Sequence, residues 1–271
     1  MKNVPVSVLT PAYNAEHYIS LAIESILNQT FADFEYIILD DASTDSTLKI
    51  IQEYAQKDKR IRVVTNRKNL YIAGARNKLI KEAKGKYIVW QDADDISLPQ
   101  RIEHQLQFME KHPKIGIVGG FLEFFGVEGV RGTRKYAQYD QSLRKNIFKI
   151  SPVAQPASMI RREVFEKVGE YDLRFPPAED LDMSFRIGMY YQFANLQETV
   201  LKYRENLTSA TFTRLKKIEK TSIGIRYYYR NSPAYHISFI DKVYNVLHYF
   251  SIFLIPPRIK IWLFNRLRNS S

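Results

Sequence analysis

Two aspartates separated by a single residue, Asp92 and Asp94, form the pattern in this chain best suited to chemistry. In extended backbone, side chains at positions i and i+2 point the same way, so both carboxylates can hold one hard divalent cation. Mg²⁺ or Mn²⁺ held in this way takes its remaining ligands from substrate phosphates and stabilises the charge on a departing diphosphate. In the alternative interpretation, Asp94, Asp95 and Ser97 cap the helix that Pro99 opens.

A second acidic pair, Glu179 and Asp180, follows two prolines at the predicted start of a helix over residues 179–189. A helix N-terminus favours an ionised carboxylate, the form that a general base needs to take a proton from a hydroxyl group. We therefore predict that Asp180 is a catalytic base. The alternative is that Asp180 and Asp182 only cap the helix.

Asp40 and Asp41 end another predicted strand. A carboxylate at that position can accept a hydrogen bond from a pyrimidine N–H or a ribose hydroxyl. Adjacent aspartates are also common where a chain enters a helix, and Ser43, Thr44 and Asp45 are alternative caps.

Two arginines, Arg76 and Arg101, lie on predicted helices that follow loops at the sheet edge. Each guanidinium is long enough to reach phosphates or base edges. A solvated surface position is the alternative for both.

The elements that would position these side chains alternate in type over the first 120 residues. Short apolar runs predict buried strands, and apolar residues at helical spacing predict helices, the first with Asn14 as its N-cap. The predicted strands cover residues 4–10, 34–39, 61–65, 87–90 and 115–118, and the helices 15–28, about 48–55, 71–84 and 99–112. This alternation predicts an α/β fold with a mostly parallel central sheet and helices on both faces. Ligands bind such sheets beyond the carboxyl ends of the strands, where residues 10–14, 40–41 and 92–94 fall.

After residue 120 the alternation is less regular. Residues 121–125 and 131–136 are predicted to pair as strands, and residues 157–161 and 199–204 to form two more. From about residue 214 the pattern is helical, basic and aromatic. We therefore expect a catalytic domain over residues 1–210 and a helical, basic C-terminal extension over residues 211–271.

Charge and composition narrow the classes of protein. The 271 residues include no cysteine, which excludes disulfides, Cys-ligated zinc and cysteine nucleophiles. The five histidines show no metal-ligand spacing. Of the net charge of +11, residues 211–271 carry 11 Lys and Arg against two acids, whereas residues 1–210 are nearly neutral. The chain shows no signal-peptide pattern and no apolar run of membrane-spanning length, so we expect a cytoplasmic protein.

Five segments in register resemble the large family of inverting nucleotide-sugar glycosyltransferases (family 2), whose bacterial members build surface polysaccharides. They are residues 6–14 (VSVLTPAYN), 38–45 (ILDDASTD), 74–77 (GARN), 85–87 (GKY) and 91–95 (QDADD). Glu179, Asp180 and Asp182 resemble a later acidic motif of the same family. The resemblance covers about residues 4–210 and implies the GT-A fold, a Rossmann-like α/β architecture. It implies transfer from a nucleotide-sugar donor, UDP-linked by default, to a saccharide or lipid-linked saccharide.

The resemblance also implies roles for individual residues. Thr10, Pro11, Tyr13 and Asp41 would frame the nucleotide base, with Asp40 near the base or ribose and Arg76 holding the nucleotide. Asp92 and Asp94 would form the metal motif, with Asp94 as the direct ligand of Mn²⁺ or Mg²⁺. Asp180 would be the base of a single displacement that inverts the anomeric carbon. The site is completed by three weaker candidates: Glu179, Arg101 and Asn206.

Asn206 marks a departure from the family pattern. Many members have Tyr-Arg-x-His-x-x-Ser late in the domain, and this chain has Asn206 where the histidine stands. An asparagine still offers an oxygen ligand or a hydrogen bond, but it lacks the chemistry of an imidazole.

The segment 243–268 mixes cations with tryptophan, leucine, phenylalanine and isoleucine around a proline pair. Such a segment can lie in the headgroup region of an anionic membrane, which would suit a lipid-linked acceptor on the inner face of the cytoplasmic membrane. The alternative is that its apolar residues cover the catalytic domain or a second subunit.

Two other functions are open to a chain of this composition. A nucleotidyltransferase that forms sugar nucleotides would share the α/β nucleotide site, but it would need a Gly-rich phosphate loop after the first strand. A nucleic-acid-binding module would use the basic extension. Against it, the acids at the predicted site would repel a phosphate backbone, so we expect no nucleic-acid partner.

Overall fold

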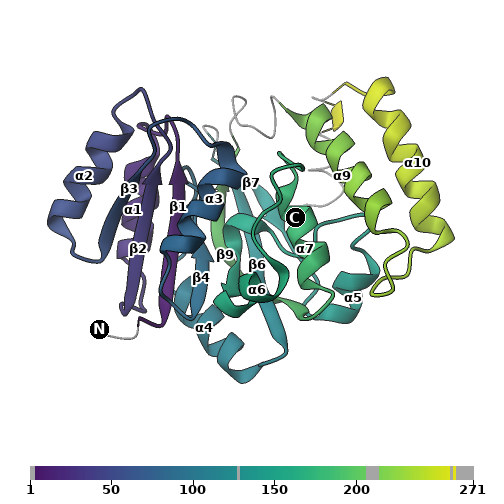
Figure 1. The fold of residues 1–271 in the computed structure, drawn as a ribbon, viewed down its shortest axis with the longest axis horizontal. Helices are drawn as coiled ribbons and strands as arrows, with labels where there is room; N and C mark the ends of the chain where they lie inside the picture. Colours follow the sequence, from purple (N-terminus) through teal and green to yellow (C-terminus); the bar gives the residue numbers. More distant parts are fainter. Residues whose placement is uncertain (1–3, 127–128, 206–213, 257–258, 261–271) are drawn as a thin grey trace.

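The computed structural model describes residues 4–126, 129–205, 214–256 and 259–260 (Figure 1). Its strands are β1 Val6–Ala12, β2 Phe34–Asp40, β3 Ile61–Thr65, β4 Tyr87–Trp90, β5 Ile96–Ser97, β6 Ile115–Gly126, β7 Gly129–Arg134, β8 Met159–Arg161 and β9 Gln192–Arg204. Its helices are α1 Ile19–Leu27, α2 Thr47–Lys57, α3 Tyr71–Glu82, α4 Arg101–Lys111, α5 Asp140–Lys145, α6 Arg162–Val168, α7 Glu179–Ile187, α9 Leu215–Tyr229 and α10 Phe239–Leu254, with a short 3₁₀ turn at Gln155–Ala157.

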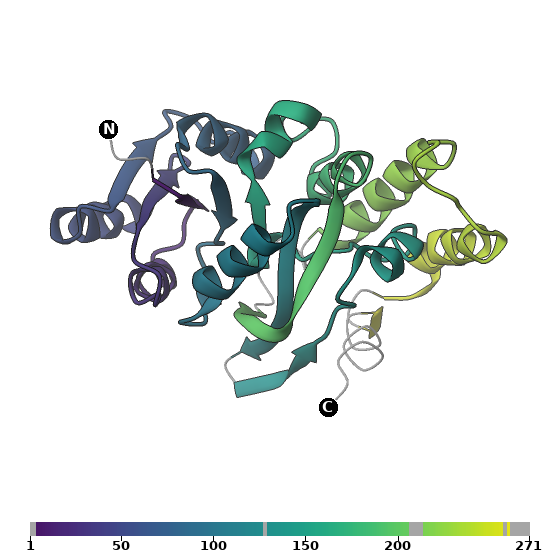
Figure 2. The same ribbon diagram turned by 90° about the horizontal axis from the view of Figure 1, so that it is seen from below.

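Both faces of the sheet are buried because its central strands are apolar on both sides. In β2, Tyr36 and Ile38 join one core, while Ile37 and Leu39 join the other. This division follows from the two-residue period of side chains along a strand. Helices α1, α2 and α4 cover the first face, and α3, α5, α6, α7 and α9 the second, so the expected α/β fold with helices on both faces is confirmed (Figure 2).

The strand order is β3-β2-β1-β4-β8-β6-β9-β5, with β7 paired to β6 outside this path. β3, β2, β1 and β4 are parallel, as the alternation of elements predicts. In the second half, β8 runs antiparallel between β4 and β6, whereas β6 and β9 are parallel to each other. The sheet is therefore mixed beyond β4.

Several predicted helix caps are wrong. Asn14 does not cap α1, which begins five residues later; its backbone is left-handed (φ 49°), and its side chain accepts a hydrogen bond from the Thr44 N–H at 2.8 Å. Gln100, not an acid, is the N-cap residue of α4, and Ala178 is that of α7. Neither residue makes a side-chain hydrogen bond as a cap, and the acids near these helix starts are not their N-cap residues.

The C-terminal extension is helical, as expected, and α9 lies against α7. The Tyr229 ring stacks on Phe185 with centroids 4.7 Å apart, and its hydroxyl donates to Asp182 Oδ1 at 2.8 Å. The predicted domain boundary near residue 210 falls in a segment outside the described residues. None of the helices in the described ranges has the length and apolar character needed to cross a membrane.

Candidate active site

The polar ends of β2, β1 and β4 lie side by side at one edge of the sheet. The Asp41 N–H donates to the carbonyl of Ala12 at 2.8 Å, and the Gln91 N–H donates to that of Leu9 at 3.0 Å. The chain therefore leaves three neighbouring strands at the same edge, and the loops that follow carry the predicted nucleotide and metal residues. This arrangement agrees with the usual place of ligands in parallel α/β sheets.

Asp92 and Asp94 follow β4 and are electrostatically coupled. Burial and the Asp92 carboxylate raise the pKa of Asp94 to about 6. Asp92 Oδ1 lies 3.6 Å from a guanidinium nitrogen of Arg76 and accepts no hydrogen bond from any described residue. Two neighbouring carboxylates, of which Asp92 has an oxygen without a donor, form a local excess of negative charge.

Arg76 joins this strand end to the start of α7, although the two are far apart in sequence. Its guanidinium lies 3.0 Å from Glu179 Oε1 and 3.6 Å from Asp92 Oδ1. It is buried against two aromatic rings, 5.5 Å from the centroid of Trp90 and 5.6 Å from that of Tyr171. The cation thus fixes the metal-motif acid and the acidic helix relative to each other.

The three acids at the start of α7 have different surroundings. Glu179 is buried and paired with Arg76, whereas Asp182 is buried, accepts the Tyr229 hydroxyl and pairs with Arg186 at 2.8 Å. Asp180 is partly exposed; its Oδ1 accepts only the neighbouring backbone N–H of Leu181, and it has no salt bridge within the described chain. Of the three, Asp180 is therefore the carboxylate available to a ligand.

The local field acts on Asp180 in two opposite ways. Burial raises its pKa above the usual aspartate value, and the Arg76 guanidinium opposes this rise. A raised pKa makes the ionised carboxylate a stronger base.

Sequence reasoning did not find Asp95 and Arg204 as parts of the site. The Arg204 backbone N–H donates to Asp95 Oδ1 at 2.9 Å, and its Nε donates to the Asp94 carbonyl at 2.9 Å. The guanidinium also packs over the rings of Tyr18 and Phe125. Arg204 therefore holds the backbone of the acidic loop; its only signal in the sequence is its place beside Tyr203 in the late family motif.

The residues predicted to frame the base lie at the same edge of the sheet but differ in how far their side chains are exposed. The Tyr13 ring is half exposed, whereas Thr10 is fully buried with its hydroxyl 3.0 Å from the Tyr36 hydroxyl. Pro11, the last but one residue of β1, is partly exposed. Asp40 is buried, and its Oδ1 accepts no hydrogen bond among the described residues. Tyr13 and Asp40 are thus better placed for a nucleotide than Thr10.

Asp41 has a structural function in addition to any contact with a ligand. Its Oδ1 accepts the Asn66 amide at 2.6 Å and the Leu70 N–H at 2.9 Å. The carboxylate therefore ties the end of β2 to the loop that leads into α3, the helix that carries Arg76.

The geometry gives Arg101 a structural role in place of the phosphate contact that the sequence suggested. The side chain is buried, and its guanidinium donates to the carbonyl of Trp90 at 2.8 Å and to Ser97 Oγ at 2.9 Å. Arg101 therefore stabilises the end of β4 instead of reaching a ligand. Asn206, the third weaker candidate, lies outside the described residues.

The residues present fit a divalent cation that shares its coordination with a substrate. Asp92 Oδ1 is a buried carboxylate oxygen without a donor, and Asp94 carries a raised pKa. In the described ranges no group of three or more His, Asp or Glu side chains could hold a metal ion. Oxygen atoms of a bound diphosphate would therefore have to complete the coordination, as is usual for Mg²⁺.

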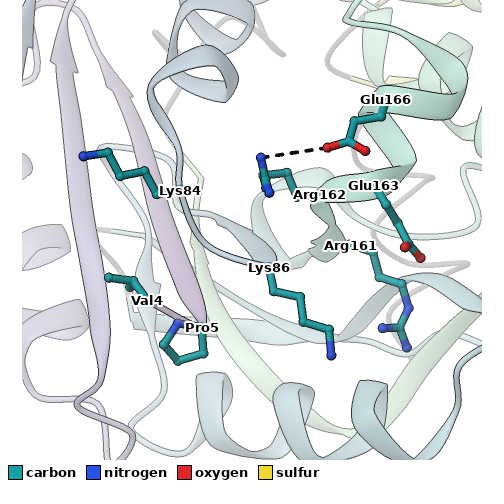
Figure 3. Close-up of a pocket in the computed structure, with 8 residues that line it drawn as sticks. All are labelled: Val4, Pro5, Lys84, Lys86, Arg161, Arg162, Glu163 and Glu166. Atoms are coloured by element: carbon teal, nitrogen blue, oxygen red, sulfur yellow. Dashed lines mark ion pairs between the residues drawn. The ribbon is translucent and has the colours of Figure 1, made fainter. Parts of the chain in front are cut away.

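A separate cavity lies at the opposite edge of the sheet, away from this site. It has a volume of about 510 Å³ and is lined by Val4, Pro5, Lys84, Lys86, Arg161, Arg162, Glu163 and Glu166 (Figure 3). Two of its cations have close partners: Lys86 pairs with Glu110 at 3.0 Å, and Arg161 donates to the Ile115 carbonyl at 2.8 Å.

Comparison with known proteins identifies the class to which this arrangement belongs. Residues 7–169 match the family described as Glycosyl transferase family 2. The chain belongs to this family. It is 37% identical over 217 residues to an uncharacterized glycosyltransferase of Methanocaldococcus jannaschii, covering 78% of this chain and 74% of the relative. The predicted enzyme class, a glycosyltransferase, is thereby confirmed.

A second relative is similar over a shorter region. The glucosyltransferase WfgD of Escherichia coli, named UDP-Glc:alpha-D-GlcNAc-diphosphoundecaprenol beta-1,3-glucosyltransferase, is 41% identical over 112 residues. The match covers 41% of this chain and 44% of WfgD.

Solved structures share the fold at lower identity. Staphylococcus aureus TarS 1-349 in complex with UDP-GlcNAc has a TM-score of 0.66 and 19% identity, over 92% of this chain and 72% of that one. The mannosyltransferase PcManGT of Pyrobaculum calidifontis, in complex with GDP-Man and Mn²⁺, has a TM-score of 0.64 and 17% identity, over 92% and 70%. These similarities confirm the expected GT-A type of architecture.

Proposed function

We propose that this glycosyltransferase uses a nucleotide-sugar donor, a UDP-sugar in the first place, and inverts the anomeric carbon. The acceptor is a saccharide or lipid-linked saccharide of a cell-surface polysaccharide. The observation that carries the proposal is the Arg76 bridge, because it brings the strand-end acids and the acids of α7 into one site. The name of WfgD and the UDP-GlcNAc complex of TarS support a UDP-sugar donor, and the name of WfgD supports a lipid-linked acceptor.

In the proposed reaction, Tyr13 and Asp40 bind the nucleotide, and Asp180 receives the acceptor hydroxyl. The acceptor oxygen attacks the anomeric carbon from the face opposite the diphosphate. The bond between this carbon and the diphosphate oxygen breaks, and its electron pair leaves with the nucleoside diphosphate. Asp180 takes the hydroxyl proton as the new bond forms, so one displacement inverts the configuration.

Asp92 and Asp94 would hold Mn²⁺ or Mg²⁺ together with the diphosphate. When bound, the cation would stabilise the charge on the leaving group. Glu179 takes no proton from the acceptor in this scheme, because its buried carboxylate is paired with Arg76.

The Asp180→Asn variant tests this assignment, because it keeps the shape of the side chain and removes the base. We expect kcat to fall by about 10² to 10⁴ while the donor Kd stays within about threefold. Asp172→Asn is the matched control. Asp172 lies a few residues before Asp180 in the chain and pairs with the exposed Arg174. Wild-type turnover in Asp180→Asn would refute the base, and retention of configuration in the product, read by NMR, would refute inversion.

A further inference from the structure

Helix α10 has its apolar side facing outwards. Its most exposed residues are large and apolar, between 56% and 79% exposed: Phe239, Ile240, Leu247, Phe250, Phe253 and Leu254. With Val243 and Val246, they span an arc of about 140° on a helix that advances 100° per residue. We call this surface the α10 outer face. In Figures 1 and 2, α10 lies at the edge of the molecule farthest from β1, β2 and β3.

The opposite side of α10 faces the protein, and around the buried Ile252 it is polar. Asp241 pairs with Lys149 at 3.0 Å, Asn245 donates to the Phe148 carbonyl at 2.9 Å, and His248 lies 3.0 Å from Glu219. These contacts fix the rotation of the helix. The outer face is therefore exposed because the polar face is bonded inwards, the reverse of an ordinary surface helix.

The exposed charge around this face has one sign. The two acids of residues 211–271 are Glu219 and Asp241, and both are buried and paired with cations. The exposed charged residues in the described part of this extension are all basic: Arg214, Lys216, Lys217, Lys220 and Lys242. Lys220 lies over the Phe253 ring at 5.1 Å, so positive charge borders the apolar surface directly.

We propose that the α10 outer face docks on an anionic lipid surface, with the helix lying flat and the flanking lysines at the headgroups. A continuous apolar face bordered by cations is the pattern of an interfacial helix. A second copy of the chain fits less well, because a symmetric contact would bring the same cations together without exposed acids to pair with them.

The docking surface is connected to the catalytic residues through packed elements. α10 packs on α9, and Tyr229 of α9 stacks on Phe185 and bonds Asp182 of α7. The first turn of α7 carries Asp180. Docking would therefore set the direction from which a lipid-linked acceptor reaches Asp180. This advantage rests on the proposed function. The docking itself does not depend on that function.

The full chain is tested for cosedimentation with phosphatidylcholine vesicles, with and without about a third of phosphatidylglycerol. We expect binding only to the anionic vesicles. The double variant L247Q/F250Q should lose at least about tenfold of this binding, and each of Lys220→Gln and Lys242→Gln about fivefold. The matched control L173Q/Y190Q changes two equally exposed apolar residues away from α10 and should bind as the wild type does.

Two results would overturn the proposal. One is equal vesicle binding by the wild type and L247Q/F250Q. The other is a wild-type dimer, in sedimentation without lipid, that L247Q/F250Q converts to a monomer while neither protein binds vesicles. Transfer to a soluble acceptor should be equal in the wild type and L247Q/F250Q. Vesicle binding without any sugar transfer would therefore refute the proposed function and leave the docking surface standing.

Discussion

Replacing Arg76 with methionine tests whether this cation holds the site together. The side chain is 5% exposed and pairs with Glu179, which is 3% exposed, and with Asp92. Methionine fills similar space between the rings of Trp90 and Tyr171 without a charge. The variant therefore leaves the buried Glu179 carboxylate and the buried Oδ1 of Asp92 without their shared cation.

The expected loss of stability is large because the pair is buried. Removing one partner of a buried ion pair costs about 3–5 kcal/mol, whereas an exposed pair contributes about 0–1 kcal/mol. Arg62→Met is the matched control, since Arg62 pairs with Glu82 and both side chains are 38–39% exposed. We expect a loss of about 3–5 kcal/mol for Arg76→Met at pH 8 and of less than about 1 kcal/mol for Arg62→Met.

The loss should shrink on acidification, and the sign follows from linkage. Burial raises the pKa of Glu179 and Asp180 in the folded protein, and Arg76 limits the rise. Between the unfolded and the raised folded pKa, the folded state binds more protons, so stability falls as pH increases. Without Arg76 both values rise further, and each additional unit costs about 1.4 kcal/mol at high pH but nothing below the unfolded pKa.

Urea unfolding followed by circular dichroism, with chelator present at pH 8 and pH 5.5, measures both effects. We expect the loss of unfolding free energy caused by Arg76→Met to be at least about 1.4 kcal/mol smaller at pH 5.5 than at pH 8. This difference corresponds to a shift of one pKa unit in one carboxyl group. A loss below about 1 kcal/mol at pH 8, or an equal loss at both pH values, would refute the bridging role of Arg76.

The remaining predictions concern the metal site and two supporting contacts. Because the pKa of Asp94 is raised to about 6 and a metal ligand must be deprotonated, Mn²⁺ affinity in calorimetry should fall about tenfold per unit below pH 6; a flat affinity would contradict this. Asp41→Asn places an amide against the Leu70 N–H and should speed hydrogen exchange of the Leu70 amide. Unchanged exchange would show that Asp41 does not hold the end of β2 to the loop before α3. Tyr229→Phe leaves Asp182 without its hydroxyl donor and should cost about 1–3 kcal/mol in thermal unfolding; an unchanged Tm would mean that the contact contributes nothing.

Local periodicity predicts the parallel half of the sheet well, because its strands and helices follow one another in the sequence. The second half depends on pairings between distant segments. β8 is only three residues long, and its place between β4 and β6 is set by the strands on either side. No local pattern contains that information.

β6 shows why glycine is ambiguous in a sequence. Gly119 and Gly120 separate the two predicted strands 115–118 and 121–125, yet one strand continues through both. A Cβ at Gly119 would lie 2.5 Å from Asn195 Oδ1, and one at Gly120 would lie 2.6 Å from a Val200 methyl group. The glycines make room for β9 instead of ending β6, and β9 is accordingly longer than predicted.

The sequence predicts which acids gather at the site, but not how the cations are shared among them. Arg76 and Arg101 are equivalent in the sequence, each on a helix after a sheet-end loop. In the structure Arg76 joins two acidic segments, whereas Arg101 supports the carbonyl of Trp90. Which of the two lies between carboxylates depends on the packing of α7, about 100 residues further along the chain.

The balance of charge at this edge explains why the site suits a divalent cation with a diphosphate. Among the described residues, five carboxyl groups (Asp92, Asp94, Asp95, Glu179 and Asp180) share the field of three guanidinium groups (Arg76, Arg101 and Arg204). Counted by formal charge, these acids exceed these cations by two, and the Asp92 charge adds to burial in raising the pKa of Asp94. A divalent cation would cancel the excess, while a diphosphate without a cation would add to it. The chain alone should thus bind a nucleoside diphosphate weakly, and each of the two ligands should strengthen binding of the other by the same factor.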